Sequence, residues 1–167
     1  MSVQGKKIAV FETTMGVIEI ELNREKAPVT VENFEKYVND GFYDGTIFHR
    51  VIPGFMIQAG GHTPDHLEKK TRSPIKLEAK NGLHNVVCTI AMARTMNPDS
   101  ATSQFFINLV DNYFLNPAPG NPGYTVFGVI VKGMDVVKKI EKVKTGNRGQ
   151  YQDWPLVDVV IKHAYML

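Results

Sequence analysis

The 167-residue sequence has one cysteine, little net charge and no apolar stretch long enough to cross a membrane. A single cysteine cannot form an internal disulfide. Cys88 lies in the apolar run VVCTIAMA, which predicts a reduced, buried thiol, and only His84 is near enough along the chain to activate it. The amino terminus has no stretch of signal-peptide length, so we expect a cytoplasmic protein with no membrane association.

The charge balance excludes one more class of protein. Lys and Arg number 19 against 17 Asp and Glu, which gives a net charge of +2. A nucleic-acid-binding domain of this size normally carries a clear basic excess, so we expect no nucleic-acid partner. Phosphate-binding loops are also missing, because neither G-x-x-x-x-G-K-[ST] nor G-x-G-x-x-G occurs. No cofactor is predicted.

Nucleophile and metal motifs are equally scarce. No serine lies in a G-x-S-x-G setting. His62 and His66 are four residues apart with Asp65 between them, a spacing that would face a metal on a helix. However, Thr63 and Pro64 follow two glycines, which favours a loop, and no third ligand has a suitable spacing. We therefore predict no metal site.

What the sequence does have is enough apolar residues, 43%, for a packed core, and a length that suits one domain over residues 1–167. Period-two alternation and turn residues predict about eight strands. Apolar residues at helical spacing predict two helices, one capped by Thr30 and ended by Gly41 and one over residues 135–144. The strands are expected in a hairpin over 10–22 and over 46–51, 56–58, 75–79, 86–93, 103–110, 124–131 and 157–166. Without a βαβ rhythm, this favours an antiparallel barrel or sandwich.

One segment, FHRVIPGFMIQAGG (residues 48–61), places a lone arginine among apolar side chains. If residues 46–51 form a strand, Phe48, Arg50 and Ile52 share one face, and Ile47, His49 and Val51 share the other. Two interpretations remain open at this point. Arg50 either lies along the wall of the barrel with its charge in solvent, or serves a site that needs a guanidinium without an acid or nucleophile.

A second apolar segment, SQFFINL (residues 103–109), is followed by Phe114 and Leu115 at a loop edge. Phe105 and Phe106 must face opposite ways on a strand, so one of them is available outside the core. Bulky apolar side chains at a loop edge usually line a site, although they could also plug the end of a barrel.

Taken in order, FHRVIPGFMIQAGG, AMAR, SQFFI, FLN and YTVFG resemble the cyclophilin-type peptidyl-prolyl cis-trans isomerases, over residues 8 to about 160. The A-M-A-R-T loop, F-L-N and the short carboxyl-terminal region are similar to the compact bacterial cytosolic branch. The resemblance implies an eight-stranded antiparallel closed barrel capped by two α-helices. It also implies an enzyme that assists protein folding by accelerating rotation about X–Pro bonds.

The resemblance further implies a groove on the outside of the barrel that holds the substrate proline. Arg50 would be the catalytic arginine, and Gln58 with the backbone at Ala93 and Arg94 would hold the peptide main chain. The residues implied for the proline pocket are Phe55, Met56, Phe106 and Leu115.

The sequence also departs from the best-known members of that family. Phe114 and Tyr124 stand where those members have tryptophan and histidine, Arg94 replaces an asparagine, and the loop 94–102 is one residue longer. The tryptophan donates a hydrogen bond to the inhibitor cyclosporin. Phenylalanine has no such donor, and Trp154 lies outside the motif, so we expect weak cyclosporin binding.

The expected partners are proline-containing peptides and client proteins, and the default oligomeric state is a monomer. Two rival functions stay open. The groove could belong to a binding module that holds proline peptides as a chaperone or adaptor, with turnover incidental. Alternatively, the barrel interior could carry a small ligand, although inward positions rich in Val, Ile, Phe and Met predict a filled core.

Overall fold

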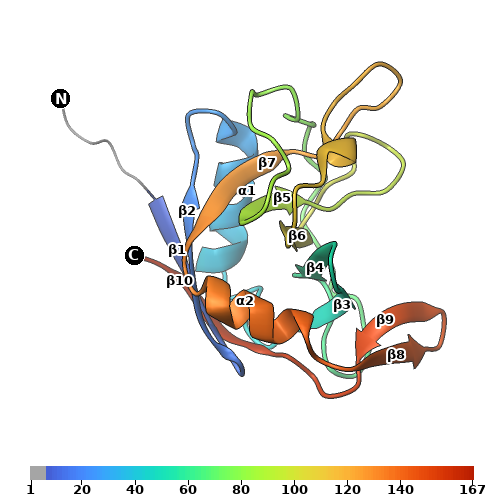
Figure 1. The fold of residues 1–167 in the computed structure, drawn as a ribbon. Helices are drawn as coiled ribbons and strands as arrows, with labels where there is room; N and C mark the ends of the chain where they lie inside the picture. Colours follow the sequence, from blue (N-terminus) through green and yellow to red (C-terminus); the bar gives the residue numbers. More distant parts are fainter. Residues whose placement is uncertain (1–6) are drawn as a thin grey trace.

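The computed structural model describes residues 7–167, which form ten strands, two α-helices and one turn of 3-10 helix, η1 (Figure 1). Neither α-helix in this part of the chain is long and apolar enough to cross a membrane. The elements in chain order are β1 (Lys7–Thr13), β2 (Gly16–Leu22), α1 (Pro28–Asn39), β3 (Phe48–Ile52), β4 (Met56–Ala59), β5 (Thr89–Met92), β6 (Phe105–Asn108), η1 (Tyr113–Leu115), β7 (Val126–Lys132), α2 (Met134–Glu141), β8 (Thr145–Arg148), β9 (Tyr151–Pro155) and β10 (Ile161–Met166).

Eight of the strands form one antiparallel sheet, in the order β10-β1-β2-β7-β5-β6-β4-β3. The sheet is curved (Figure 1), and the segments that lead into its two edge strands, β3 and β10, are hydrogen-bonded to each other. There, Ile47 and Val160 form an isolated bridge, and the Phe48 N–H donates to the Val159 carbonyl at 3.0 Å. The strand number, the antiparallel pairing and the two helices confirm the predicted fold. The word "closed" overstates it, because the edges meet just before each strand begins and form no continuous ladder.

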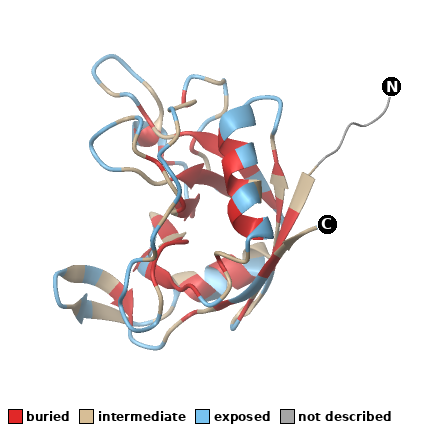
Figure 2. Ribbon diagram, turned by 180° about the vertical axis from the view of Figure 1, so that it is seen from behind, coloured by how far each residue is buried: buried red, intermediate tan, exposed pale blue. Residues whose placement is uncertain are grey.

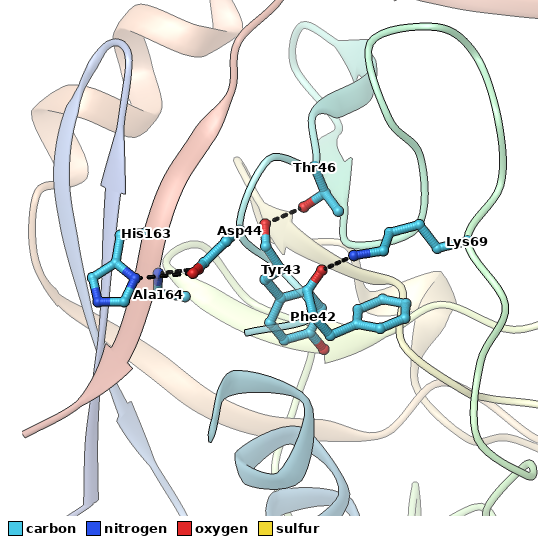
Figure 3. Close-up of polar contacts among 7 residues, drawn as sticks. All are labelled: Phe42, Tyr43, Asp44, Thr46, Lys69, His163 and Ala164. Atoms are coloured by element: carbon cyan, nitrogen blue, oxygen red, sulfur yellow. Dashed lines mark hydrogen bonds and ion pairs between the residues drawn. The ribbon is translucent and has the colours of Figure 1, made fainter. Parts of the chain in front are cut away.

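Residues 42–46 connect β10, at this edge of the sheet, to the loop that contains Lys69 (Figure 3). Asp44 accepts a hydrogen bond from the Ala164 N–H at 2.9 Å, and its other oxygen lies 3.1 Å from His163 Nδ1. Two residues earlier, the Phe42 carbonyl accepts from Lys69 Nζ at 2.6 Å. The segment therefore holds β10 on one side and the loop before residue 70 on the other.

The hairpin predicted over residues 10–22 is confirmed as β1 and β2, which pair residue by residue from Lys7 to Thr13. The buried side chains of β2 are Ile18, Ile20 and Leu22, as the period-two alternation predicts. In the turn, Thr13 Oγ1 donates to the Gly16 carbonyl at 2.6 Å. Gly16 has a φ of 135°, a conformation that favours glycine.

The start of α1 differs from the prediction. Thr30 is not the cap but lies buried in the first turn, and Pro28 occupies the first helical position. The carboxylate of Glu78, from a distant loop, takes the capping role. It accepts from the N–H groups of Val29 (3.2 Å) and Thr30 (2.8 Å) and from Thr30 Oγ1 (2.7 Å). A negative charge there also complements the helix dipole.

Glu78→Ala should therefore lower the free energy of unfolding by about 1–2 kcal/mol, the usual cost of losing a helix cap. Urea denaturation of the wild type and the variant measures this. Glu25→Ala, which removes an exposed carboxylate from the turn before α1, is the control for negative charge alone and should shift the midpoint less than Glu78→Ala does. Equal midpoints for Glu78→Ala and the wild type would show that this cap contributes nothing.

The strand predicted over residues 75–79 is wrong. Only Ile75 pairs, in an isolated bridge to Ala101. Farther along, the N–H groups of this segment donate to side chains instead of to a strand; the Leu77 N–H, for example, donates to Asp99 Oδ1 at 2.9 Å. Because its donors are used in this way, the segment cannot extend a ladder.

Two further features of the structure differ from the prediction. Cys88 is free but only half-buried, at a φ of 74° just before β5, whereas a buried thiol was predicted. The sequence patterns also did not predict the two-stranded sheet formed by β8 and β9. These strands have no alternating apolar pattern, and their largest buried side chain is Trp154.

The second helix, α2, is shorter than the predicted 135–144. Val136, Val137 and Ile140 are buried, as predicted from their spacing. The helix ends at Glu141 because the Lys142 N–H bonds the Lys139 carbonyl, three residues back, at 3.2 Å. Packing against β2, β3 and β4 places α2 beside the strands that carry the FHRV and MIQA segments.

Aromatic rings fill the space enclosed by the sheet and α1. Phe34 of α1 lies 5.1–5.9 Å, ring centroid to ring centroid, from four other rings, and all five are fully buried. The four are Phe11, Tyr43, Phe105 and Phe127. Figure 2 shows buried residues along the strands and on the side of α1 that faces them. A filled interior argues against a carrier that holds a ligand inside the barrel.

Candidate active site

The hairpin of β3 and β4 presents Arg50 at the surface. A register shift between Phe48 and Arg50 leaves His49 without a partner, so Phe48 pairs with Ala59 while Arg50 pairs with Gln58. The predicted sharing of one face by Phe48 and Arg50 is therefore wrong, because the bulge turns Phe48 into the core and leaves Arg50 exposed. Pairing places the Arg50 and Gln58 side chains next to each other.

Beside Arg50 lies a cavity of about 140 Å³ in the outer surface of the sheet. Its apolar side chains belong to a small cluster separate from the main core. Phe106 faces this cluster while Phe105 faces the core, as their adjacent positions on a strand predict. Nine of the ten predicted site residues line the cavity: Arg50, Phe55, Met56, Gln58, Ala93, Arg94, Phe106, Leu115 and Tyr124.

Among the residues that the structure describes, the Arg50 guanidinium has one hydrogen-bond partner, Gln58: Arg50 Nη1 donates to Gln58 Oε1 at 3.3 Å. Within residues 7–167 no carboxylate lies in ion-pair distance of Arg50. A guanidinium has five N–H donors and stays charged. Most of its donors are thus available to a group that enters the cavity.

Phe114 is the predicted site residue that does not line the cavity. It belongs to η1, its side chain is 64% exposed, and its ring stacks on Phe55 with centroids 5.7 Å apart. Phe114 therefore forms an apolar rim next to the cavity wall. A ligand that extends beyond the cavity on this side would meet two phenyl rings and no indole N–H.

Two of the positions that depart from the family pattern contact each other. The Arg94 guanidinium lies 4.3 Å from the Tyr124 ring centroid, a cation–π arrangement. Its Nη2 donates to the Gly123 carbonyl at 2.7 Å and its Nη1 to the Thr95 carbonyl at 2.8 Å. The side chain of Arg94 thus fixes its own loop against Tyr124. No hydrogen bond within residues 7–167 involves the Arg94 main chain.

Three buried asparagines hold the backbone of residues that line the cavity, and the sequence patterns did not predict them. Asn85 Nδ2 donates to the Leu115 carbonyl at 3.2 Å, and Asn112 Nδ2 donates to the Phe55 carbonyl at 2.9 Å. Asn108 connects the two, since it donates to Asn85 Oδ1 and accepts from Asn112 Nδ2. One feature of the sequence could have indicated this group: Asn108 is a polar residue at the end of an apolar strand.

The histidines considered as zinc ligands are separated. His62 is buried, with its ring centroid 4.2 Å from that of His49, whereas His66 is exposed and its Nε2 lies 2.6 Å from Arg148 Nη1. In the part of the chain that the structure describes, no group of three His, Cys, Asp or Glu side chains could hold a metal ion.

Burial sets the charge of the histidine pair. Burial, with smaller contributions from His62 and Arg50, lowers the pKa of His49 to about 3. Burial also lowers the pKa of His62, against an opposing effect of Glu68. His49 is therefore neutral at pH 7, and the cationic group in the hairpin that faces the cavity is Arg50.

A guanidinium free of acids, beside a small apolar cavity on the outside of a curled antiparallel sheet, defines a site that can enclose an apolar ring and donate hydrogen bonds to atoms attached to it. Residues 8–166 match the sequence model of a family described as cyclophilin type peptidyl-prolyl cis-trans isomerase/CLD. The chain belongs to this family, and it is a peptidyl-prolyl cis-trans isomerase.

Relatives with this name occur in several bacteria. The chain is 58% identical, over 151 residues, to a peptidyl-prolyl cis-trans isomerase of Acinetobacter baylyi, covering 90% of this chain and 80% of that protein. It is 54% identical, over 158 residues, to isomerase B of Escherichia coli K12, covering 93% and 96%. A crystal structure of a Cryptosporidium parvum cyclophilin has the same fold, with a TM-score of 0.77 at 24% identity and coverage of 96% and 98%.

Proposed function

We propose that the cavity beside Arg50 is the active site of one isomerase domain spanning residues 1–167. The cavity holds the substrate proline ring, and Arg50 stabilises the twisted imide. The observation that carries this proposal is the combination of an acid-free guanidinium with a ring-sized apolar cavity. The residues proposed to contact the proline ring are Phe55, Met56, Phe106 and Leu115.

The proposed role follows from the physics of the imide bond. Rotation about X–Pro is opposed by a barrier of roughly 18–20 kcal/mol, which is lost amide resonance. When the bond twists, the proline nitrogen recovers its lone pair and becomes a hydrogen-bond acceptor. A donor aimed at that nitrogen binds the twisted form more tightly than either planar form, which is differential binding of the transition state. No acid, base or nucleophile is needed.

Arg50 and the cavity share the catalytic effect in this account. A charge-assisted hydrogen bond contributes roughly 1.5–3 kcal/mol, and a tenfold rate increase needs about 1.4 kcal/mol. Arg50 alone would then give one or two powers of ten. The rest comes from holding the ring in the cavity while Gln58 and the main chain at Ala93 and Arg94 bind the peptide backbone, so that the acyl side rotates.

A protease-coupled assay on a peptide with a cis X–Pro bond tests turnover directly. We expect the rate of conversion to trans to rise linearly with enzyme concentration, with saturation at high peptide concentration. The alternative, a binding module for proline peptides, predicts saturable binding by calorimetry with an unchanged conversion rate. That result would contradict the proposed active site, because binding all forms equally accelerates nothing.

Cyclosporin binding tests the rim of the site. Phe114 lacks an N–H donor, so we expect inhibition of the wild type to be weak and Phe114→Trp to strengthen it by about tenfold, the equivalent of one hydrogen bond. An inhibition titration of both proteins at the same peptide concentration measures the change. Turnover without inhibitor should stay within about twofold of the wild-type rate. Equal potency for the two proteins would refute this role of the rim.

We further propose that the enzyme is a cytoplasmic monomer that acts on prolines in unfolded and folded client proteins. An open, exposed rim at Phe114 supports access by segments of large clients as well as short peptides. Sedimentation velocity and acceleration of a proline-limited refolding reaction test these two statements.

A further inference from the structure

We propose that Glu68, which lies outside the proline cavity, is a positioning residue that orients Arg50 through two glutamines. Arg50 Nη1 donates to Gln58 Oε1 at 3.3 Å, Gln58 Nε2 donates to Gln104 Oε1 at 2.9 Å, and Gln104 Nε2 donates to Glu68 Oε2 at 3.1 Å. The four side chains form one continuous chain of hydrogen bonds from the cavity to the loop after β4. This inference rests on the proposed role of Arg50.

The two ends of this chain fix its direction. A guanidinium can only donate and an ionised carboxylate can only accept, whereas a glutamine amide can do either, depending on which way it is turned. With Arg50 at one end and Glu68 at the other, both amides have one arrangement that satisfies every link. Without Glu68, Gln104 can turn over, and Gln58 can then present its NH₂ group to Arg50. Two donors would face each other, and Arg50 would lose its support.

The loop that carries Glu68 is itself held in place. Glu68 forms an isolated antiparallel bridge with His62, and the Lys69 N–H donates to the Gly61 carbonyl at 2.8 Å. Although the Glu68 side chain is exposed, its backbone is therefore fixed relative to the end of β4. A fixed backbone limits the positions that the carboxylate can reach and makes it a suitable anchor.

Gly61 provides independent evidence for the position of the Gln104 side chain between Gln58 and Glu68. A Cβ at residue 61 would lie 2.7 Å from both Cγ and Nε2 of Gln104. The backbone of Gly61 does not lie in the left-handed region, so the residue is required for space and not for conformation. Gly61 thus makes room for the amide that links Gln58 to Glu68.

This arrangement predicts a particular kinetic signature. Arg50 acts on the twisted imide, whereas the apolar cavity binds the proline in every form. Loosening Arg50 should therefore lower kcat and leave KM nearly unchanged. A residue that only stabilised the fold would affect activity at high temperature, where part of the protein unfolds. At 10 °C, its substitution would leave kcat as well as KM unchanged.

The test compares Glu68→Ala, Glu68→Gln and Gly61→Ala with the wild type, using Arg50→Ala as a reference and Glu25→Ala as an exposed control. We expect Glu68→Ala and Gly61→Ala to lower kcat about threefold, because a solvent-exposed link is worth less than a full hydrogen bond. Glu68→Gln keeps an acceptor oxygen but can also turn its NH₂ group toward Gln104, so it should recover only part of the rate. NMR relaxation of the Arg50 Nε–H group should show increased mobility in Glu68→Ala and not in Glu25→Ala.

The outcomes separate this inference from the proposed function. Loss of activity in Arg50→Ala with unchanged kcat and unchanged Arg50 mobility in Glu68→Ala would overturn the role of Glu68 alone. A lower kcat in Glu68→Gln than in Glu68→Ala would also overturn it, because an acceptor oxygen at residue 68 would then give Gln104 no support. Full activity in Arg50→Ala would instead remove the proposed active site itself.

Discussion

Arg50→Lys is expected to lower kcat/KM for X–Pro isomerisation by about 10- to 100-fold, while the dissociation constant for a proline peptide changes by less than about threefold. A lysine keeps the positive charge but not the planar fork of N–H donors. It can approach the cavity without holding the Gln58 amide and the imide nitrogen at the same time. Peptide binding should survive because the apolar side chains that enclose the ring are unchanged.

Protease-coupled kinetics and calorimetry on the same preparations measure these two quantities. Arg24→Lys is a suitable control, since Arg24 is a surface residue paired with Glu35, away from the cavity. It should match the wild type in both measurements. A rate for Arg50→Lys close to that of the wild type would show that positive charge alone suffices and that the fork has no role.

Acid should destabilise the protein well before its carboxylates are protonated. The pKa of His49 is lowered to about 3 in the folded state, against about 6.5 in an unfolded chain. Between these values the unfolded state binds more protons, so stability is fully present above about pH 6.5 and falls as the pH decreases. At pH 5, proton uptake by His49 lowers the free energy of unfolding by about 2 kcal/mol relative to pH 7, which corresponds to a decrease in Tm of about 4–8 °C.

His49→Phe is the variant that tests this explanation, because it keeps an aromatic ring beside His62 and Trp154 but cannot bind a proton. Thermal denaturation at pH 7 and pH 5 should show a smaller difference in Tm for His49→Phe than for the wild type. His84→Gln replaces an exposed histidine and should leave the difference unchanged. A wild-type difference that persists in full in His49→Phe would place the acid sensitivity elsewhere.

Local sequence patterns predicted the parts of the fold that local physics determines. The hairpin of β1 and β2 and the buried face of α2 follow from periodicity and turn residues. The start of α1 did not, because its cap is a carboxylate 48 residues away from Thr30. The β8–β9 hairpin was missed because its strands are stabilised by Trp154 against His49 and His62 and not by alternation.

The candidate site shows the same division. Family motifs identified the residues that line the cavity, since each motif is a continuous segment. The bulge at His49 could not be foreseen, because it depends on how β3 pairs with β4. Neither could the links from Gln58 through Gln104 to Glu68, which join residues up to 46 positions apart. Side chains that act through other side chains leave no local pattern.

The central claim is that Arg50 accelerates rotation of a bound X–Pro imide without being needed to bind it. Exchange NMR on a proline peptide, with the wild type and Arg50→Ala compared at equal bound fractions, measures the two effects together. The account predicts rapid cis–trans exchange on the wild type and exchange at least tenfold slower on Arg50→Ala. Equal exchange rates at equal occupancy would contradict it.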